Sequence, residues 1–398
     1  SAHVRVSRGT PDADPLALWT LVAGNGVRWL GIGFFVPFLP LFIGGRGGGA
    51  GLVGMVFAAR LAGSALGQYP GGWLSDRWGS RPVVVVSLGL FALGFPMYLL
   101  PIPSLALVGI GFAHSLVSGL YEPAARSVLA EQVDPARRGR AYSRLQASTE
   151  AGLLLGPAAG GLAANLSLAV VFWAAAGICL AATLPLLRLP GRTRSEPVVP
   201  AAGSEGIPAP APTVLRRMLP LIAFVGPVFW MFAVLNTVSI LYVQSRGAGP
   251  AQVGVYYAAF SMPVVVLGAV WPGLPDRLGY VRAAALALLS LAVTGILFPL
   301  LTSVTLLIGL SFAMGVVTMP ILSAGWAEIS RRAPPGGQGR AQALGLISIT
   351  ALQAAASLVS GATYQVRPAL AFWTITAVSL TGLAAGLALD RWHAPPPS

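Results

Sequence analysis

The sequence predicts an all-α integral membrane protein with twelve transmembrane helices in two six-helix pseudo-repeats. Composition is the first reason: of 398 residues 55% are hydrophobic and 9% are charged, whereas soluble chains carry about 25% charged residues. Long uncharged stretches are the second. No residue between Arg282 and Glu328 is charged, which leaves room for two spans of roughly 20 residues each. The third reason is an internal repeat, which indicates duplicated halves.

The repeat is carried by short polar segments that recur 200 residues apart. Gly72–Gly79 matches Pro272–Gly279, and both contain an Asp-Arg pair between two apolar runs. Gly139–Ala141 matches Gly339–Ala341, again 200 residues on. Because the matches keep the same order and register, we interpret each Asp-Arg segment as a loop between two spans of one half.

Twelve apolar segments are long enough to cross a bilayer as helices. Internal Gly and Pro are frequent in them, and bilayer helices tolerate both. The short alternating segments of a β-barrel are absent. The expected helices are Leu16–Ile43, Ala50–Leu74, Val83–Leu100, Ser104–Leu129, Ala141–Ala164, Leu168–Leu187, Met218–Gln244, Ala251–Leu274, Val281–Leu301, Val304–Ala327, Ala341–Tyr364 and Ala369–Leu389.

Charge distribution predicts the orientation of these spans. The net charge is +13, and all 25 basic residues are arginines. If the amino terminus is cytoplasmic, only Arg46, Arg246 and Arg367 fall on outer loops. This positive-inside bias predicts a multi-pass protein of the inner (plasma) membrane with both termini in the cytoplasm. It also explains the basic charge without nucleic acid.

The domain organisation follows from the spans and from one segment rich in Pro, Ala and Gly. That segment lacks helical periodicity, so we expect a cytoplasmic linker there. The expected divisions are a tail at 1–14, an amino-terminal half at 15–188, the linker at 189–216, a carboxy-terminal half at 217–390 and a tail at 391–398.

Together these features resemble the major facilitator superfamily, whose fold has twelve helices in two six-helix halves. The first Asp-Arg segment resembles its signature Gly-x-Leu-x-Asp-Arg-x-Gly-x-Arg, and the second copy departs from it at Pro272. The resemblance implies a cytoplasmic gate in which an aspartate latches the halves. The alternative is an anchor at the membrane interface that only fixes topology. The gate residues implied are Gly72, Asp76, Arg77, Gly79, Arg81, Glu131, Asp276 and Arg277.

The fifth expected helix carries a Gly-x-x-x-Gly-Pro-x-x-Gly-Gly pattern. It resembles the signature of the proton-coupled drug antiporter branch, and the eleventh helix lacks it. Small residues four apart let helices touch backbone to backbone, so generic packing is the alternative. The fourth helix departs from the branch, because Ser115 stands where antiporters usually carry an arginine. The signature residues are Gly152, Gly156, Pro157, Gly160 and Gly161.

Ionisable residues at bilayer depth are functional candidates. Glu150 lies ~14 Å into its helix at 1.5 Å per residue, and a carboxyl in a low-dielectric cavity can be protonated near neutral pH. We expect Glu150 to carry the proton, and its charged form to have water, Arg28 or Arg60 as partner; a static ion pair that holds helices together is the alternative. Glu122 is expected to pair locally with Arg126.

Two further groups of polar residues at depth complete the candidate site. His114 is either a proton relay or a hydrogen-bonded core histidine, and both readings stay open. The second group is expected to line a substrate cavity, although ordinary packing would also account for it. Its residues are Asn25, Arg28, Arg60, Trp230, Asn236, Tyr256, Tyr257 and Gln353.

These observations favour a monomeric, proton-coupled secondary transporter that works by alternating access and exports lipophilic or amphiphilic compounds, as a multidrug efflux antiporter does. A lipid or glycolipid flippase, or an anionic-amphiphile transporter of the same fold, is the alternative, and a nutrient symporter is third. No catalytic grouping or phosphate loop predicts an enzyme. The single cysteine, Cys179, excludes an internal disulfide and a cysteine metal cluster. The expected partners are the substrate, protons and lipid, with no cofactor or metal.

Overall fold

The computed structural model describes residues 15–133, 138–187, 211–267, 278–332 and 338–393, and these form twelve helical rods without a strand. Two rods are interrupted by a short stretch of another helical type, and a third ends in a 3₁₀ turn. The first half contains α1 (Pro15–Phe35) continued by a 3₁₀ turn (Val36–Phe38) and α2 (Leu39–Gly45), then α3 (Ala50–Trp78), α4 (Ser80–Met97), α5 (Ala106–Gln132), α6 (Arg138–Ala164) and α7 (Leu168–Leu186).

The second half repeats this series. Its first rod starts at Ala211, inside the segment expected as linker, and contains a π-helical stretch. The elements are α8 (Ala211–Val234), the π-helix Leu235–Ser239, α9 (Ile240–Ser245), α10 (Pro250–Leu267), α12 (Tyr280–Leu297) with the 3₁₀ turn Phe298–Leu300, α13 (Val304–Arg332), α14 (Gln338–Val366) and α15 (Pro368–His393).

The first Asp-Arg segment is not a loop, and that expectation was wrong. Helix α3 runs through it as far as Trp78, because nothing between Gly72 and Trp78 breaks a helix. The chain turns at Gly79 alone, whose φ is 89°. Gly279 occupies the matching place in the second half with φ 78°. Only glycine adopts such angles without strain, so the repeat preserves the turn residue.

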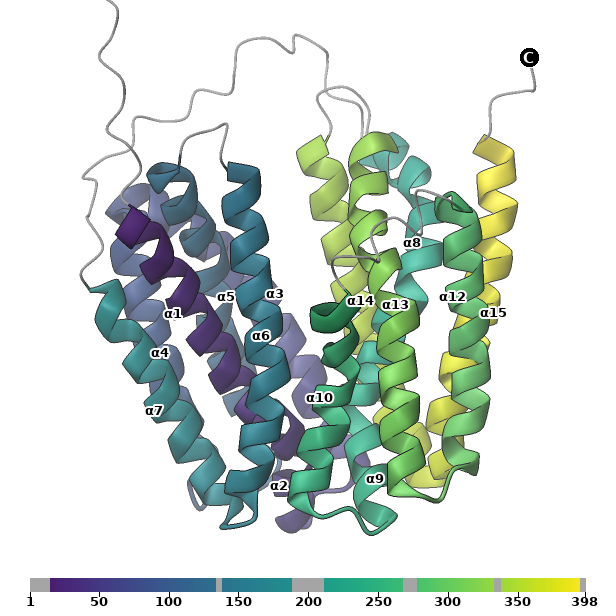
Figure 1. Cartoon of the computed structure of the whole chain (residues 1–398), viewed down its shortest axis with the longest axis horizontal. Helices are drawn as coiled ribbons and strands as arrows, with labels where there is room; N and C mark the ends of the chain where they lie inside the picture. The colour runs from purple at the N-terminus through teal and green to yellow at the C-terminus, as the bar shows by residue number, and fades with distance from the viewer. Residues whose placement is uncertain (1–14, 134–137, 188–210, 268–277, 333–337, 394–398) are drawn as a thin grey trace, which may run out of the picture.

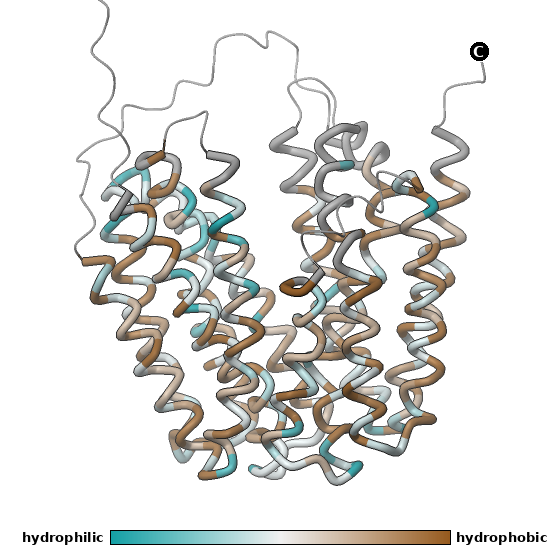
Figure 2. The backbone as a smooth tube through the Cα atoms, viewed as in Figure 1, coloured by the Kyte–Doolittle hydropathy of each residue, from teal (hydrophilic) through white to brown (hydrophobic). Residues whose placement is uncertain are grey.

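The two halves stand side by side, and their ribbons converge at one end and diverge at the other (Figure 1). We call the end that carries Pro15 and His393 the inner end, after the predicted orientation, and the opposite end the outer end. Eight of the described helices are long and apolar enough to cross a membrane. Hydrophobic residues run along all of the rods, and hydrophilic ones gather near their ends (Figure 2).

Glycines bring the halves together at the outer end. A Cβ built on Gly254 of α10 would lie 2.3 Å from the carbonyl oxygen of Pro157 in α6. On the other side, a Cβ on Gly54 of α3 would lie 2.3 Å from the carbonyl oxygen of Ser357 in α14. Side chains would separate these backbones, so the small residues are what allows the contact.

Glycines also allow close contacts between helices within the first half. A Cβ on Gly156 would lie 2.5 Å from the carbonyl oxygen of Leu30 in α1. A Cβ on Gly63 of α3 would lie 2.2 Å from the carbonyl oxygen of Phe112 in α5, and a Cβ on Gly67 would lie 2.1 Å from that of Leu116. The fifth-helix signature therefore packs α6 against α1 through Gly156 and against the other half through Pro157.

The third, sixth, ninth and twelfth rods lie at the flanks: α4 and α7 on one side, α12 and α15 on the other (Figure 1). Their outward positions carry large apolar side chains. On α4, Leu90 and Leu93 are 50% and 63% exposed, and on α12 Leu286 and Val293 are 55% and 53% exposed. Such faces suit lipid, so the rods that meet across the halves are left to form the interior.

Candidate functional site

A buried ion pair joins α1 to α5. Arg28 Nη1 lies 3.0 Å from Glu122 Oε1, and the two side chains are 3% and 32% exposed. Arg28 follows Pro15, the inner end of α1, by about 20 Å, and Glu122 precedes the inner end of α5 by about 15 Å at 1.5 Å per residue. The pair therefore lies at mid-depth.

The remaining donors of Arg28 are only partly satisfied. Nη2 donates to Ser118 Oγ at 2.8 Å, and the guanidinium lies over the Tyr121 ring at 4.3 Å. Its Nε is buried without a hydrogen-bond partner in the described chain. Arg28 thus depends on Glu122 for charge balance.

Glu122 also faces Arg126, whose Nη2 lies 4.0 Å from Oε2 one helical turn away. The expected local pair is present, but it is the longer and more exposed of the two contacts. The Glu122 carboxylate therefore contacts arginines on both α1 and α5. The spacing in α5 predicted the contact with Arg126 but not the contact with Arg28.

Glu150 has a different environment from the one expected. Its Oε1 accepts a hydrogen bond from Gln146 Nε2 at 2.8 Å, and the side chain is partly buried. Neither of the two arginines considered as its partner contacts it: Arg28 pairs with Glu122, and Arg60 donates to a tyrosine. Each arginine reaches a different neighbouring helix, and helix periodicity cannot choose between neighbours.

Arg60 of α3 is held by an aromatic group. Nη1 donates to the hydroxyl of Tyr98 at 3.2 Å, and the guanidinium lies 5.1 Å from the ring centre of Phe35 and 5.8 Å from that of Phe57. Its helix, α3, packs against the π-helix Leu235–Ser239 of the other half. The side chain is partly exposed, so its other N–H groups remain open to solvent or ligand.

Tyr257 belongs to a polar pair on the second half. Its hydroxyl donates to Asn236 Oδ1 at 2.6 Å, and Asn236 Nδ2 donates to the carbonyl of Phe232 at 2.7 Å. Asn236 lies in the π-helix Leu235–Ser239, and such stretches are frequent at functional sites. Of the expected cavity residues, the fold brings Tyr257 and Asn236 into contact. The π-helix that carries Asn236 packs against α3, the helix of Arg60.

His114 sits in a closed aromatic group. Nε2 lies 2.8 Å from the carbonyl oxygen of Phe91, so that nitrogen carries the proton and donates. The ring stacks on Phe91 at 4.3 Å and meets the edge of Phe95 at 4.7 Å. Only 4% of the residue is exposed. This geometry fits the second of the two interpretations of His114, a hydrogen-bonded core histidine.

Other residues expected in the cavity are bonded into helix contacts. Asn25 is 3% exposed, and its amide donates to Ser148 Oγ and Thr149 Oγ1 of α6 at 3.0 and 2.9 Å. Trp230 Nε1 donates to Thr374 Oγ1 of α15 at 3.0 Å. Tyr256 is 1% exposed.

Gln353, the last of the expected cavity residues, lies partly buried in α14. Asn25 and Trp230 join helices through hydrogen bonds, and the Tyr256 ring packs against Phe298. All three are buried, so their polarity at depth does not mark a surface open to substrate.

The gate residues lie at the inner end. Asp76 is exposed and forms no ion pair with another described residue, while Arg77 lies over the Trp73 ring at 5.6 Å. Arg81 donates to the carbonyl of Leu187 in α7. Asp276, Arg277 and the side chain of Glu131 fall outside the described residues.

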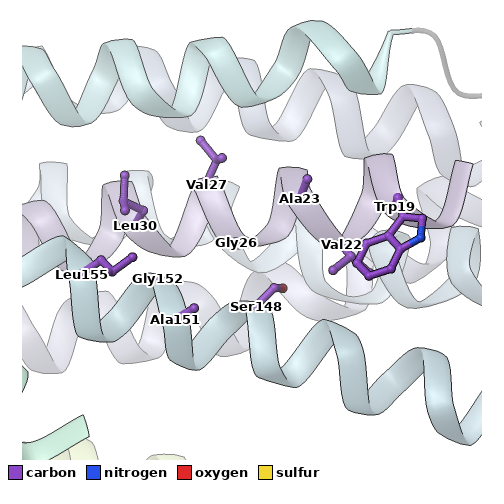
Figure 3. Close-up of a pocket in the computed structure, with 10 residues that line it drawn as sticks. All are labelled: Trp19, Val22, Ala23, Gly26, Val27, Leu30, Ser148, Ala151, Gly152 and Leu155. Carbon is purple, nitrogen blue, oxygen red and sulfur yellow. The ribbon is translucent and has the colours of Figure 1, made fainter. Parts of the chain in front are cut away.

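An apolar groove of about 320 Å³ runs between α1 and α6 (Figure 3). It contains one hydroxyl side chain, Ser148, and no charged group. At its inner end, Arg144 lies over the Trp19 ring at 5.1 Å. The lining residues are Trp19, Val22, Ala23, Gly26, Val27, Leu30, Ser148, Ala151, Gly152 and Leu155. The groove is separate from the charged residues described above.

Two functional partners were missed from the sequence. Ser118 precedes Glu122 by one helical turn, so the shared face was a signal that could have found it. Tyr98 ends α4 at the outer end, and nothing in the local sequence connects it to Arg60.

Residues 21–359 match the sequence model of the Major Facilitator Superfamily. The chain belongs to this superfamily. In the solved nucleoside transporter NupG the same fold is found, with a TM-score of 0.76 at 12% identity over 95% of this chain and 100% of that one. The twelve-helix fold expected from the sequence is therefore confirmed.

Two relatives carry resistance names. The Tetracycline resistance protein, class G, of Vibrio anguillarum is 29% identical over 333 residues, which is 75% of this chain and 78% of that protein. The Multidrug resistance protein MdtH of Aeromonas salmonicida (strain A449) is 29% identical over 197 residues, 49% of each chain. This chain spans about half the length of that multidrug relative. The resemblance to the drug-efflux branch is confirmed.

Proposed function

We propose that this superfamily member is a proton-coupled secondary transporter that exports lipophilic or amphiphilic compounds by alternating access. The resistance names of its relatives support efflux as the direction. The observation that carries the proton coupling is the Arg28–Glu122 pair, because it joins two helices at mid-depth and one partner is partly exposed.

The proposed coupling step is a change in that pair. When Glu122 is charged, it holds Arg28 and so holds α1 against α5. When Glu122 takes a proton, the charge attraction between the two side chains is lost, and Arg28 keeps the hydrogen bond to Ser118 and its contacts with aromatic rings. The two protonation states therefore favour different positions of α1 relative to α5.

Asp76 supports the assignment of the conformation. The ribbons of the two halves diverge at the inner end (Figure 1), and Asp76 there is exposed. We infer an inward-open state in which the gate is unlatched, with both termini and the linker in the cytoplasm. In the outward-open state, Asp76 would meet the amino end of a helix in the other half.

The test uses proteoliposomes with an imposed pH gradient and compares wild type, Glu122→Gln and Glu150→Gln. Gln imitates a protonated carboxyl and keeps its shape. We expect Glu122→Gln to lose uphill accumulation of substrate while it retains downhill exchange. If Glu122→Gln accumulates substrate like wild type and Glu150→Gln does not, the proton is carried by α6. If neither variant differs from wild type, proton coupling through these carboxyls is wrong.

A further inference from the structure

Arg60 places a positive charge deep in the membrane. It follows the outer end of α3 by ten residues, which is about 15 Å along the helix. The inner end of α3, Trp78, is about 27 Å away by the same rise. An arginine at that depth is expensive unless it is balanced by an opposite charge or reaches water.

No carboxylate in the described chain balances Arg60. The ion pairs there join Arg28 and Arg126 to Glu122, and Glu150 accepts its hydrogen bond from Gln146. Among the described residues, the hydrogen-bond partner of Arg60 is the neutral hydroxyl of Tyr98. Arg28 has a carboxylate at 3.0 Å, so the two mid-depth arginines are in opposite situations.

The surroundings of Arg60 suit an amphiphile. Phe35 and Phe57 cover the guanidinium from its own half. Tyr257 and Asn236 lie on the facing half, both partly exposed. Because α3 packs against the π-helix that carries Asn236, a ligand that binds Arg60 and extends to Asn236 or Tyr257 would touch both halves and respond to their relative position.

We propose that Arg60 binds an oxyanion of the transported compound, which is therefore an amphiphile with a carboxylate, phosphate or similar acidic head and an apolar body. This rests on the proposed transport function and names its substrate class. The guanidinium offers paired N–H donors in a plane that matches such a head, and the partly exposed Tyr257 on the facing half offers an aromatic ring to the apolar body. The ligand supplies the negative charge that the protein lacks at this position.

Binding is tested with one fluorescent compound in three charge forms: dansyl-aminoundecanoate, its neutral amide and the corresponding amine. Fluorescence titration of the purified protein should show the carboxylate binding at least about tenfold more tightly than the amide, as a charged hydrogen bond implies. Arg60→Met should abolish that preference, and Arg60→Lys should keep part of it. Equal binding of the three forms to wild type overturns the proposal.

Arg246 provides the matched control. Its Nη2 donates to the hydroxyl of Tyr242 at 2.6 Å, and its guanidinium lies 4.7 Å from that ring centre, but it is exposed at the outer end. Arg246→Met removes the same charge and the same kind of contact, and should leave the preference for the carboxylate intact. If it reduces the preference as much as Arg60→Met does, the effect is one of net charge and the proposal is wrong.

Thermal unfolding separates a binding role from a structural one. Removing an unbalanced charge should leave the apparent Tm of ligand-free Arg60→Met equal to or above that of wild type, while the Tm increase caused by the carboxylate is lost. A lowered Tm with the increase retained would mean that Arg60 only holds Tyr98, which overturns the proposal.

The two proposals fail differently. Proton-driven accumulation of the amine but not the carboxylate would overturn the oxyanion site and leave proton-coupled export standing. Carboxylate binding that depends on Arg60, without any proton-driven accumulation, would leave the site standing and refute the proposed function.

Discussion

Replacing Glu122 by Leu should destabilise the protein strongly, because it strands a buried cation. Arg28 is 3% exposed and has Glu122 as its only anionic partner in the described chain. Breaking a buried ion pair from one side typically lowers the free energy of unfolding by about 3–5 kcal/mol. Ser118 and the Tyr121 ring remain in contact with Arg28, so we expect the lower end of that range, about 3 kcal/mol.

The loss of stability in each matched variant should depend on the partner that the substitution leaves for the remaining side chain. Glu122→Gln keeps an oxygen acceptor for Arg28 and should lower stability by only about 1–2 kcal/mol, the value of a hydrogen bond that loses its charge assistance. Arg28→Met should also be mild, because Glu122 is 32% exposed and still has Arg126 at 4.0 Å. The double variant Arg28→Met/Glu122→Leu should recover most of the loss.

The assay is unfolding of the purified protein in detergent, followed by tryptophan fluorescence and by size-exclusion chromatography after heating. The double-mutant cycle isolates the interaction between the two side chains. The reasoning is refuted if Glu122→Leu is no less stable than Glu122→Gln, or if adding Arg28→Met brings no recovery.

Three further predictions concern packing and the gate. Gly67→Leu should prevent stable folding, because a Cβ there would lie 2.1 Å from a backbone oxygen of α5, whereas Gly89→Leu, with nothing within 4 Å, should express and elute like wild type; equal behaviour of the two would contradict the α3–α5 contact. Gly254→Leu should separate the halves at the outer end without unfolding either, seen as increased labelling of a single outer cysteine in a Cys179→Ser background; unchanged labelling would argue against that contact. Asp76→Asn should slow transport in vesicles while expression stays normal, and a wild-type rate would rule out the latch.

Much of the fold could be predicted from the sequence because the bilayer imposes strong local constraints. A spanning helix must be long and nearly uncharged, so composition along the chain marks each rod. The duplicated Asp-Arg segments marked the two halves. Their glycines Gly79 and Gly279 do turn the chain, but the segment before Gly79 continues as helix, since the residues from Trp73 to Trp78 include no helix breaker.

The candidate site was predicted only in part. The sequence by itself placed Arg28, Arg60 and Glu150 near mid-depth, because depth follows from position along a helix of known rise, whereas Glu122 was expected only in a local pair with Arg126. It did not determine their partners. Arg28 and Glu122 are 94 residues apart, and a helical pattern gives the face of a residue on its own helix but not the helix opposite.

The partners of these side chains are set by tertiary packing. It paired Arg28 with Glu122, left Glu150 with Gln146, and left Arg60 without a carboxylate. It also turned Asn25 into a helix contact. Glycine stripes set which backbones approach closely, and that choice fixes which polar side chains meet. The sequence therefore determined the number, length and charge content of the helices, and only the tertiary structure decided which charge is balanced.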